Sequence, residues 1–402
     1  MKKLSPALVV PLLLGMVSFS YAEEILPKGK LQDLSLRLLR HVQVRNRIQM
    51  EGDRQRENYY EELVDEGSQA VPLMRMLGGL TVEGRGWLRF DRMMMVKDHE
   101  FLGERYRPNA RVNSPIGPIT TNSFRMVDKE YSLEKPAGTR RIVLLGDSIT
   151  RGLGVPQELR CESLLEDWLN ELSAQHGGGK VEILNQSVIA YRLSKFLYLA
   201  QEAAPAFSPD VYIVALTPLQ HGLRWSDDIG NLVRNRKHPR YPFIEDLIRR
   251  AELKPEESRD VHLKKLEPFH RETMRWFLAE MKATAERQRV SLLVLLLPSV
   301  MPLAEMQQQF RGTIELLNEL AVPYLNVLDV FRDHEHRLSS LAIGGDDEHP
   351  TVEANGMIFH ALQKQLRERP ELQSLLLDSS AALPAAARQG KPASSGSSRS
   401  GN

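Results

Sequence analysis

Short apolar runs alternate with amphipathic stretches from residue 140 onward, and this alternation constrains the fold more than any other feature of the sequence. Apolar side chains repeat at helical spacing between the runs, as from Cys161 to Leu172 and from Leu303 to Leu320. Near-continuous apolar strands separated by helices require a parallel sheet that is covered on both faces. The runs predict five strands: Ile142–Leu145, Val181–Leu184, Val211–Leu216, Ser291–Leu297 and Pro323–Leu328.

This pattern predicts a doubly wound α/β domain over about residues 138–370, with a last helix over about Val352–Leu366. Residues 23–137 are expected to form a helical and irregular extension, irregular around Pro108, Pro115 and Pro118. Residues 218–268 make a long insertion after the third strand, either a lid or flap or a decorated surface. Its arginines would recognise an anionic glycan or form a solvated face.

Composition excludes several classes of function. Lysine and arginine number 53 against 52 aspartates and glutamates, so the net charge of +1 argues against a nucleic-acid-coating chain. Neither a Walker loop nor a G-x-G-x-x-G motif occurs, so nucleotide binding has no support. A single cysteine, Cys161, excludes an intrachain disulfide and a cysteine metal cage. We predict no cofactor.

The two ends of the sequence differ in character from the middle. Residues 1–22 are typical of an export signal, with Lys2 and Lys3 before a short apolar run and Ser20-Tyr21-Ala22 at the cleavage site. The mature chain would begin at Glu23 and act in the periplasm or outside the cell; the alternative is an uncleaved membrane anchor. Residues 371–402 are expected to form a low-complexity disordered tail, which is rich in Ser, Ala, Gly and Pro from Ser379.

The block Gly146-Asp147-Ser148 directly follows the first predicted strand. A serine at a strand-to-helix turn is exposed at the edge of the sheet, and the helix that begins there directs N–H groups toward it. Gly146 permits a tight turn. The structural alternative is a helix N-cap, which Asp and Ser also favour. The block therefore indicates a candidate nucleophile, Ser148.

His349 lies in a loop before the last predicted helix, at the same edge of the sheet. A serine hydroxyl needs a base, and a neutral imidazole is that base near neutral pH. We predict that Asp346, three residues earlier, folds back and orients the ring. Asp347 and Glu348 are near alternatives, although an adjacent residue in a turn points elsewhere. An oxygen-rich metal site at Asp147, Asp346, Asp347, Glu348 and His349 is disfavoured because no second histidine supports it, so we predict no metal.

These two blocks resemble those of the SGNH (or GDSL) hydrolases, in which Gly-Asp-Ser follows the first strand and Asp-x-x-His precedes the last helix. The resemblance covers about residues 140–366. It implies a three-layer α/β/α domain and ester-hydrolysing or acyl-transferring chemistry. Ser148 would be the nucleophile, His349 the base and Asp346 its partner.

The middle blocks of the family pattern are altered. The glycine whose N–H would bind the oxyanion is replaced by Ala190, which keeps the N–H but tolerates fewer backbone angles. The family's Gly-x-Asn-Asp block becomes Thr217-Pro218-Leu219-Gln220, and Leu219 cannot donate. Gln220 or His221 would replace the lost donor if the register slips. Asn122 and Arg125 are further candidates, either as donors or as part of a structural turn.

Three functions follow in order of preference. The first is an exported SGNH-type serine hydrolase that acts on carboxylic, especially acetyl, esters through an acyl-enzyme. The second is an O-acyltransferase that acts on an exported polysaccharide, and the third is a non-catalytic binding protein on a hydrolase scaffold. The expected substrate is an acylated small molecule or glycan, with transient association with envelope polysaccharide machinery and no nucleic-acid or nucleotide partner.

Overall fold

The computed structural model describes residues 85–220, 224–344 and 347–378. The chain divides at residues 71 and 72, and all described residues belong to the second unit. The predicted export signal and the first part of the predicted extension therefore lie outside the described residues, as does residue 379 onward.

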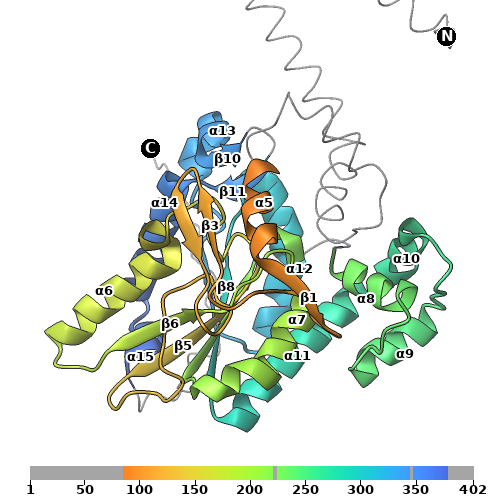
Figure 1. Ribbon diagram of the computed structural model, residues 1–402, viewed down its shortest axis with the longest axis horizontal. Coiled ribbons are helices and arrows are strands. Elements are labelled where there is room, and N and C mark those ends of the chain that lie inside the picture. The colour runs from red at the N-terminus through yellow and green to blue at the C-terminus, as the bar shows by residue number, and fades with distance from the viewer. Residues whose placement is uncertain (1–84, 221–223, 345–346, 379–402) are drawn as a thin grey trace, which may run out of the picture. The chain divides into compact units, whose positions relative to one another are not determined.

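Five parallel strands form the central sheet: β5 (Arg140–Leu145), β6 (Val181–Asn185), β7 (Val211–Leu216), β8 (Ser291–Leu296) and β9 (Tyr324–Asn326). Their order is β6-β5-β7-β8-β9, and Ile142 lies opposite Ile183 on one side and Val211 on the other (Figure 1). Every residue of β5, β6 and β7 is buried, as the continuous apolar runs predict. The predicted doubly wound sheet is confirmed.

Helices α6 (Cys161–Gln175), α14 (Val352–Glu368) and α15 (Pro370–Leu377) cover one face of this sheet (Figure 1). Alternate strand residues point to them, so Ile142, Leu144 and Ile213 share one apolar core with leucines of all three helices. Burial of this core supplies the main driving force for the packing of this layer.

The opposite face is covered by α7 (Leu193–Tyr198), its π-helical continuation (Leu199–Ala203) and α11 (His270–Gln288), with α12 (Leu303–Glu319) against α11. Tyr212 of β7 points to this side, where its hydroxyl bonds the Ala200 carbonyl at 3.1 Å and the Gln288 side chain at 2.6 Å. The molecule therefore has the three layers of an α/β/α fold.

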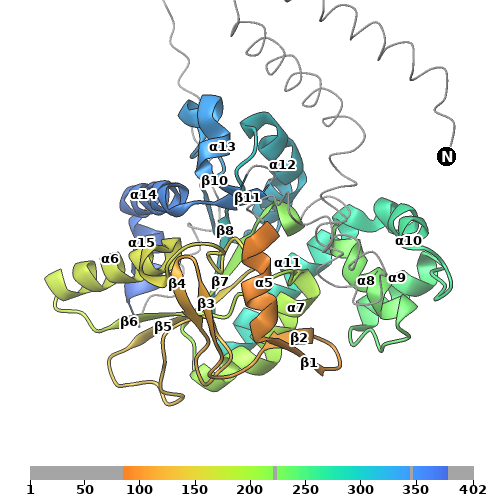
Figure 2. The same ribbon diagram turned by 45° about the horizontal axis from the view of Figure 1, so that its top comes forward.

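The described part of the insertion after β7 forms three short helices, α8 (Arg224–Arg234), α9 (Pro242–Arg250) and α10 (Arg259–Leu266). They make one helical group, at the right of Figure 2, with apolar side chains such as Ile229, Ile244 and Leu263 buried. Arginines of this group pair with carboxylates. Arg259 bonds Asp227, and Arg249 and Arg250 pair with Asp246.

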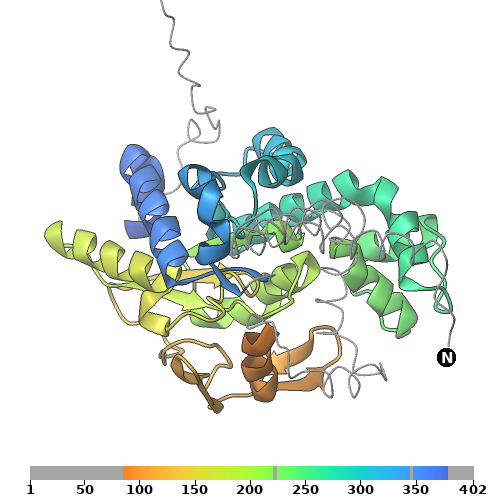
Figure 3. The same ribbon diagram turned by 90° about the horizontal axis from the view of Figure 1, so that it is seen from above.

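The segment before the sheet is more regular than predicted. Helix α5 (Arg85–Met94) is followed by two antiparallel hairpins, β1 (Met95–His99) with β2 (Gly103–Tyr106) and β3 (Arg111–Ser114) with β4 (Gly117–Thr120), drawn in orange in Figure 3. The prediction of irregular structure around Pro115 and Pro118 is wrong, because both lie in the second hairpin. Pro115 occupies the two-residue turn of the second hairpin, and Gly117 takes the positive φ of 105° that follows it.

The predicted tail begins too early. Residues 370–377 form α15, and Leu372, Leu375 and Leu376 are buried against the core. Pro370 stands in the first turn, where the missing N–H costs nothing, and the leucines at i, i+3 and i+4 share one face. Arg140 of β5 donates to the Leu375 carbonyl at 2.7 Å. Helix α15 is therefore part of the domain.

The remaining regular elements are short. Those just before α14 are the short helix α13 (Leu338–Leu341) and the antiparallel strands β10 (Ala342–Gly344) and β11 (Asp347–Pro350), and short 3-10 turns at 157–159, 204–207, 218–220, 267–269 and 332–337 connect other elements. Over the described ranges, no helix combines the length and the apolar character of a membrane span.

Candidate active site

The candidate nucleophile follows β5, the strand at which the order of the sheet reverses. Clefts in such sheets open at the carboxyl ends of the strands beside this point. Ser148 lies in a tight turn, in which Arg151 N donates to the Asp147 carbonyl at 2.8 Å and Leu153 N to the Ser148 carbonyl at 3.1 Å. A Cβ at Gly146 would lie 2.7 Å from a carbon of the Thr150 side chain. Only glycine fits this turn as it stands.

His349 is on β11, 201 positions after Ser148, and the fold brings the two together. Its Nε2 lies 2.7 Å from the Ser148 hydroxyl oxygen, which is hydrogen-bond distance. Both side chains are buried, with exposed fractions of 2% for Ser148 and 1% for His349. The pair is therefore arranged for proton transfer from hydroxyl to imidazole.

The carboxylate on the other ring nitrogen belongs to Asp347, which corrects the predicted role of Asp346. Asp347 Oδ1 contacts His349 Nδ1 and also accepts from the His349 backbone N–H at 2.9 Å. Asp346 itself lies outside the described residues. The prediction assumed a turn, but residues 347–350 form a strand, and in a strand residues i and i+2 point to the same face. In an extended segment, this alternation indicates the residue two positions before His349, which is Asp347.

Asp347 also sets the proton affinity of the ring. Burial by itself lowers the pKa of His349, but the charge and the hydrogen bond of Asp347 outweigh it, so the pKa lies above its ordinary value. The carboxylate thereby fixes the tautomer with a free Nε2 and stabilises the imidazolium that forms after proton transfer.

Asp147 is a scaffold residue of the site rather than a group open to substrate. It is fully buried and accepts hydrogen bonds from the Thr217 hydroxyl, from Gln220 Nε2 at 3.2 Å and from Ile149 N at 3.0 Å. Burial raises the pKa of its carboxyl, although these bonds act in the opposite direction. Asp147 thus ties the end of β7 to the nucleophile turn.

Gln220 is not placed as the replacement oxyanion donor. Its amide nitrogen donates both to Asp147 and to the Tyr191 carbonyl, each at 3.2 Å, so both hydrogens are used. The residue is fully buried, and His221 lies outside the described residues. The sequence pattern does not reveal that Gln220 faces the carboxylate of Asp147, which lies in the nucleophile turn.

Ala190 adopts the left-handed conformation that the missing glycine would favour, with φ of 58°. Its loop is tied to the nucleophile turn, because Val188 N donates to the Gly146 carbonyl at 3.2 Å. Within the part of the chain that the structure describes, neither Ser148 N–H nor Ala190 N–H has a protein acceptor. These two amides are the candidate oxyanion donors.

Asn122 and Arg125 belong to a structural turn, the alternative that the sequence left open. Asn122 donates to the Lys129 carbonyl at 2.8 Å and accepts from the Phe124 and Met126 amides. Arg125 bonds the Tyr106 carbonyl at 2.9 Å and pairs with Asp98 at 3.2 Å. These bonds fasten the pre-sheet segment together, and none of them involves Ser148 or His349.

The carboxylates around His349 are occupied by protein donors. Asp147 and Asp347 make the bonds given above, and Glu348 accepts from the Ser299 hydroxyl at 3.1 Å. In the described portion of the chain, no three His, Cys, Asp or Glu side chains are grouped as metal ligands.

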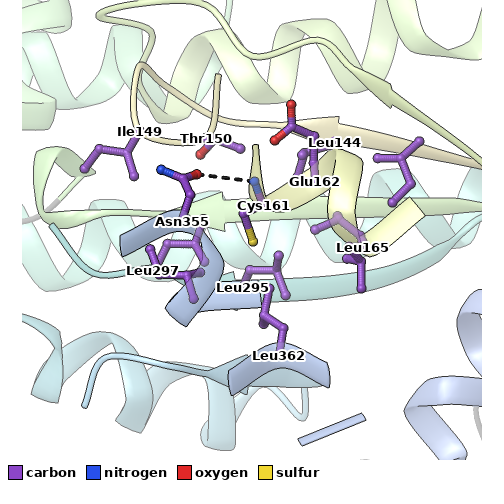
Figure 4. A pocket seen from close by; sticks show the side chains of 13 residues that line it. Leu144, Ile149, Thr150, Cys161, Glu162, Leu165, Leu295, Leu297, Asn355 and Leu362 are labelled. Carbon is purple, nitrogen blue, oxygen red and sulfur yellow. Dashed lines mark hydrogen bonds between the residues drawn. The ribbon is translucent and has the colours of Figure 1, made fainter. Parts of the chain in front are cut away.

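A small cavity of about 30 Å³ lies behind the nucleophile turn (Figure 4). Ile149 and Thr150 line it from the turn, with Cys161 and Glu162 from α6 and Asn355 from α14. A volume of this size holds one or two water molecules and no substrate. Burial raises the pKa of Glu162 to about 7. This cavity is an internal packing space next to the turn and not a substrate-binding pocket.

Comparisons with known proteins find only distant similarity. No family model and no curated protein matches the chain. Among solved structures, TesA is 13% identical with a TM-score of 0.36 and covers 57% of this chain and 99% of its own. The esterase EstA from Pseudoalteromonas sp. is 14% identical with a TM-score of 0.35, and the match covers 57% of this chain and 97% of EstA. A catalytic mutant of Axe2, an acetylxylan esterase from Geobacillus stearothermophilus, is 14% identical with a TM-score of 0.37, and the match covers 57% of this chain and 93% of Axe2.

The sheet order, the Gly-Asp-Ser turn after β5 and the histidine before α14 decide the fold on the chain's own geometry. The fold is a doubly wound, three-layer α/β/α fold with a serine–histidine pair beside strand β5. At such identities and TM-scores, the similarity says nothing about the substrate or the activity of this chain.

Proposed function

We propose that this chain is an exported SGNH-type serine hydrolase that cleaves carboxylic esters, acetyl esters foremost, through an acyl-enzyme. One observation carries the proposal, namely the 2.7 Å contact between the Ser148 hydroxyl and His349 Nε2, with Asp347 on the opposite ring nitrogen. A buried serine in contact with an oriented imidazole is an activated nucleophile whenever the ring is unprotonated.

In the first half-reaction, Ser148 Oγ attacks the ester carbonyl carbon while its proton passes to His349 Nε2. A tetrahedral intermediate forms with the negative charge on the former carbonyl oxygen. The imidazolium, stabilised by Asp347, then gives the proton to the alkoxide of the alcohol as the C–O bond breaks. The alcohol leaves, and the acyl group remains on Ser148.

In the second half-reaction, His349 takes a proton from water, and the hydroxide attacks the acyl carbon. A second tetrahedral intermediate collapses, the proton returns to Ser148 Oγ, and the carboxylic acid leaves. In each half-reaction, the attack creates an oxyanion and an imidazolium, and the collapse of the intermediate neutralises both. No electrons are gained or lost, so the cycle needs neither a cofactor nor a redox partner.

The backbone N–H groups of Ser148 and Ala190 would stabilise both intermediates. A third, side-chain donor is absent from the described positions after β7, because Gln220 is used by Asp147 and Tyr191. One lost oxyanion donor costs about 10²–10³-fold in rate. We therefore infer a slow esterase rather than an inactive one.

A second candidate is acyl transfer to a hydroxyl of an exported polysaccharide. Ser148 and His349 are only 2% and 1% exposed, which limits the access of bulk water and of a glycan hydroxyl alike, so only the dependence of the rate on an acceptor separates the two candidates. Cleavage of the predicted export signal at residues 1–22 would put either reaction outside the cytoplasm, where an acetylated envelope glycan is a reasonable substrate.

The test compares wild type and Ser148→Ala for hydrolysis of p-nitrophenyl acetate and for labelling by a fluorophosphonate probe. Ser173→Ala is the matched control, since Ser173 is also buried but bonds the Gly179 carbonyl at the far end of α6. We expect labelling at Ser148 in wild type and control, with a loss of activity above about 10³-fold in Ser148→Ala.

Equal, slow hydrolysis by wild type and Ser148→Ala, without labelling, would instead identify a non-catalytic binding protein. Acetyl release measured with and without a glycan acceptor separates the two enzymatic candidates. A release rate that rises with acceptor and yields acetylated glycan supports transfer, while a rate independent of acceptor supports hydrolysis.

A further inference from the structure

Three charged or polar side chains are buried together behind the nucleophile turn. Asp91, Tyr106 and Arg151 have exposed fractions of 0%, 1% and 1%. Arg151 follows Ser148 by three residues, whereas Asp91 is on α5 and Tyr106 ends β2, both outside the region that resembles the hydrolase family.

The cluster is held by direct polar contacts. Arg151 Nη2 lies 2.8 Å from Asp91 Oδ1, and the Tyr106 hydroxyl donates to the same oxygen at 2.5 Å. Burial alone lowers the pKa of Arg151, but Asp91 and Tyr106 outweigh it, so the pKa is raised and the guanidinium stays charged. A buried charge of this kind depends strongly on its partner.

The backbone of Arg151 is part of the turn that carries the nucleophile. Its N–H donates to the Asp147 carbonyl at 2.8 Å, and its Nη1 donates to the Gly152 carbonyl at 3.3 Å. Two residues on, Leu153 N donates to the Ser148 carbonyl at 3.1 Å. A displacement of the Arg151 side chain is therefore transmitted to Ser148 through hydrogen bonds of one short turn.

Helix α5 also lies where the two halves of the site meet. A Cβ placed on Gly154 would lie 3.5 Å from the Trp87 ring of α5 and 3.1 Å from the Ile343 side chain of β10. Gly154 has a φ of 76°. The end of the nucleophile turn is thus packed between α5 and the hairpin that carries His349.

From these contacts we propose that Asp91 is a positioning residue for the ester-cleaving reaction, acting through Arg151 on the turn that holds Ser148. The segment α5–β2 is then an integral part of the catalytic unit rather than an appended extension. This inference rests on the proposed function, and it assigns a role to a segment for which the family pattern offers none.

The test uses the full-length chain with Asp91→Asn, which keeps the shape of the side chain but removes the charge opposite Arg151. We expect the rate of fluorophosphonate labelling and kcat to fall by about 10- to 100-fold, with KM within about twofold of wild type, because small misplacements of a nucleophile have effects of this size. Tyr106→Phe, which removes one hydrogen bond and no charge, should give a smaller fall in the same direction.

The matched control is Glu182→Gln, which also removes the carboxylate paired with a buried arginine. Glu182 pairs with Arg141 at 2.9 Å where β5 begins, at the opposite end of the strand from Ser148. Rates are compared per folded molecule, measured by thermal melting. A general loss of stability would slow both variants alike, whereas positioning slows Asp91→Asn alone.

Equal effects of Asp91→Asn and Glu182→Gln, or a rise in KM with kcat unchanged, would overturn the inference while the proposed function stands. Wild type that fails to label at Ser148 overturns the proposed function instead. Amide exchange then decides the inference by itself. Faster exchange at Arg151 and Leu153 in Asp91→Asn, but not in Glu182→Gln, supports it, and unchanged exchange overturns it.

Discussion

The turn that holds Ser148 and the hairpin that holds His349 supply one site by different means. The turn continues a strand that is hydrogen-bonded to neighbours on both sides. The hairpin β10–β11 is a separate two-stranded sheet with an irregular register, joined to the rest through bonds such as Val300 N to the Glu348 carbonyl at 2.8 Å. The nucleophile is built on the core, and the base on its margin.

This difference teaches where the site is sensitive. At the turn, geometry is fixed by backbone packing, so steric changes should be costly there. At the hairpin, few backbone bonds define the ring position, so the orientation of His349 depends on Asp347. Loss of the Asp347 carboxylate should therefore be the costliest change at the hairpin, whereas the turn should respond both to added volume at Gly146 and to loss of the Asp91 charge.

The largest expected effect is that of Asp347→Asn on the hairpin. Loss of the carboxylate frees the ring and removes the group that raises the pKa of His349. We expect kcat/KM to fall by about 10²–10⁴-fold. Since the neutral imidazole is the base, wild-type activity declines as pH falls through this raised pKa, and in the variant that decline should move to lower pH.

Asp346→Asn is the matched control, because it alters the adjacent carboxylate that the family spacing favours. We expect less than about a threefold change in kcat/KM, measured across pH with p-nitrophenyl acetate. A larger loss in Asp346→Asn than in Asp347→Asn would reverse the assignment and restore the prediction from the sequence.

Gly146→Ala probes the turn by volume alone. The added Cβ would collide with the Thr150 side chain, so the turn that carries both residues must shift. We expect labelling of Ser148 to slow by about 10-fold or more and the free energy of unfolding to drop by about 1–3 kcal/mol. Gly312→Ala, where nothing lies within 4 Å of the added Cβ, is the control. Equal behaviour of the two variants would show that the turn is not tightly packed.

Protonation of the buried Glu162 is expected to make the stability of the folded protein depend on pH. Asn185 Nδ2 donates both to Glu162 Oε1 at 2.9 Å and to the Thr150 carbonyl at 3.1 Å. Because burial raises the folded pKa of Glu162 to about 7, above its unfolded value, the protonated folded state is favoured and its stability falls as pH rises toward 7. We expect this loss, on the order of 1–3 kcal/mol, to vanish in Glu162→Gln, as measured by urea unfolding between pH 5 and pH 8. Parallel pH curves for both proteins would contradict it.

The smallest effect is expected for Ala190→Gly. Glycine relieves the left-handed conformation of φ 58° but adds freedom to the unfolded chain, so the net gain in stability should be at most about 1 kcal/mol. The N–H is unchanged, and kcat should stay within about threefold of wild type. A clear loss of activity would mean that the alanine methyl group itself contacts substrate.

Much of the fold was predictable because the buried strands are marked by apolar residues without interruption. The predicted limits of Val211–Leu216 are confirmed, and those of β5, β6 and β8 differ by one or two residues. The position of Ser148 followed from the same signal, since a serine directly after a central strand must lie at the carboxyl edge. His349 followed because its block precedes the last helix that covers that edge.

The errors have one physical origin, namely side chains whose role depends on distant partners. The sequence spacing favours Asp346, but residues 347–350 are extended, and extended backbone brings the carboxylate two residues before His349 to its ring. Gln220 seemed free because nothing nearby in sequence reveals that Asp147 and Tyr191 accept its hydrogens. Asp91 carried no signal at all, since its partner Arg151 is sixty positions away.

The 201 positions between Ser148 and His349 have a consequence during synthesis of the protein. The serine leaves the ribosome long before the histidine, and α14 and α15, which complete the core around β5, come later still. A nascent or prematurely terminated polypeptide consequently carries an inert hydroxyl. Any reactivity of this serine should therefore emerge only once the whole sheet has been enclosed.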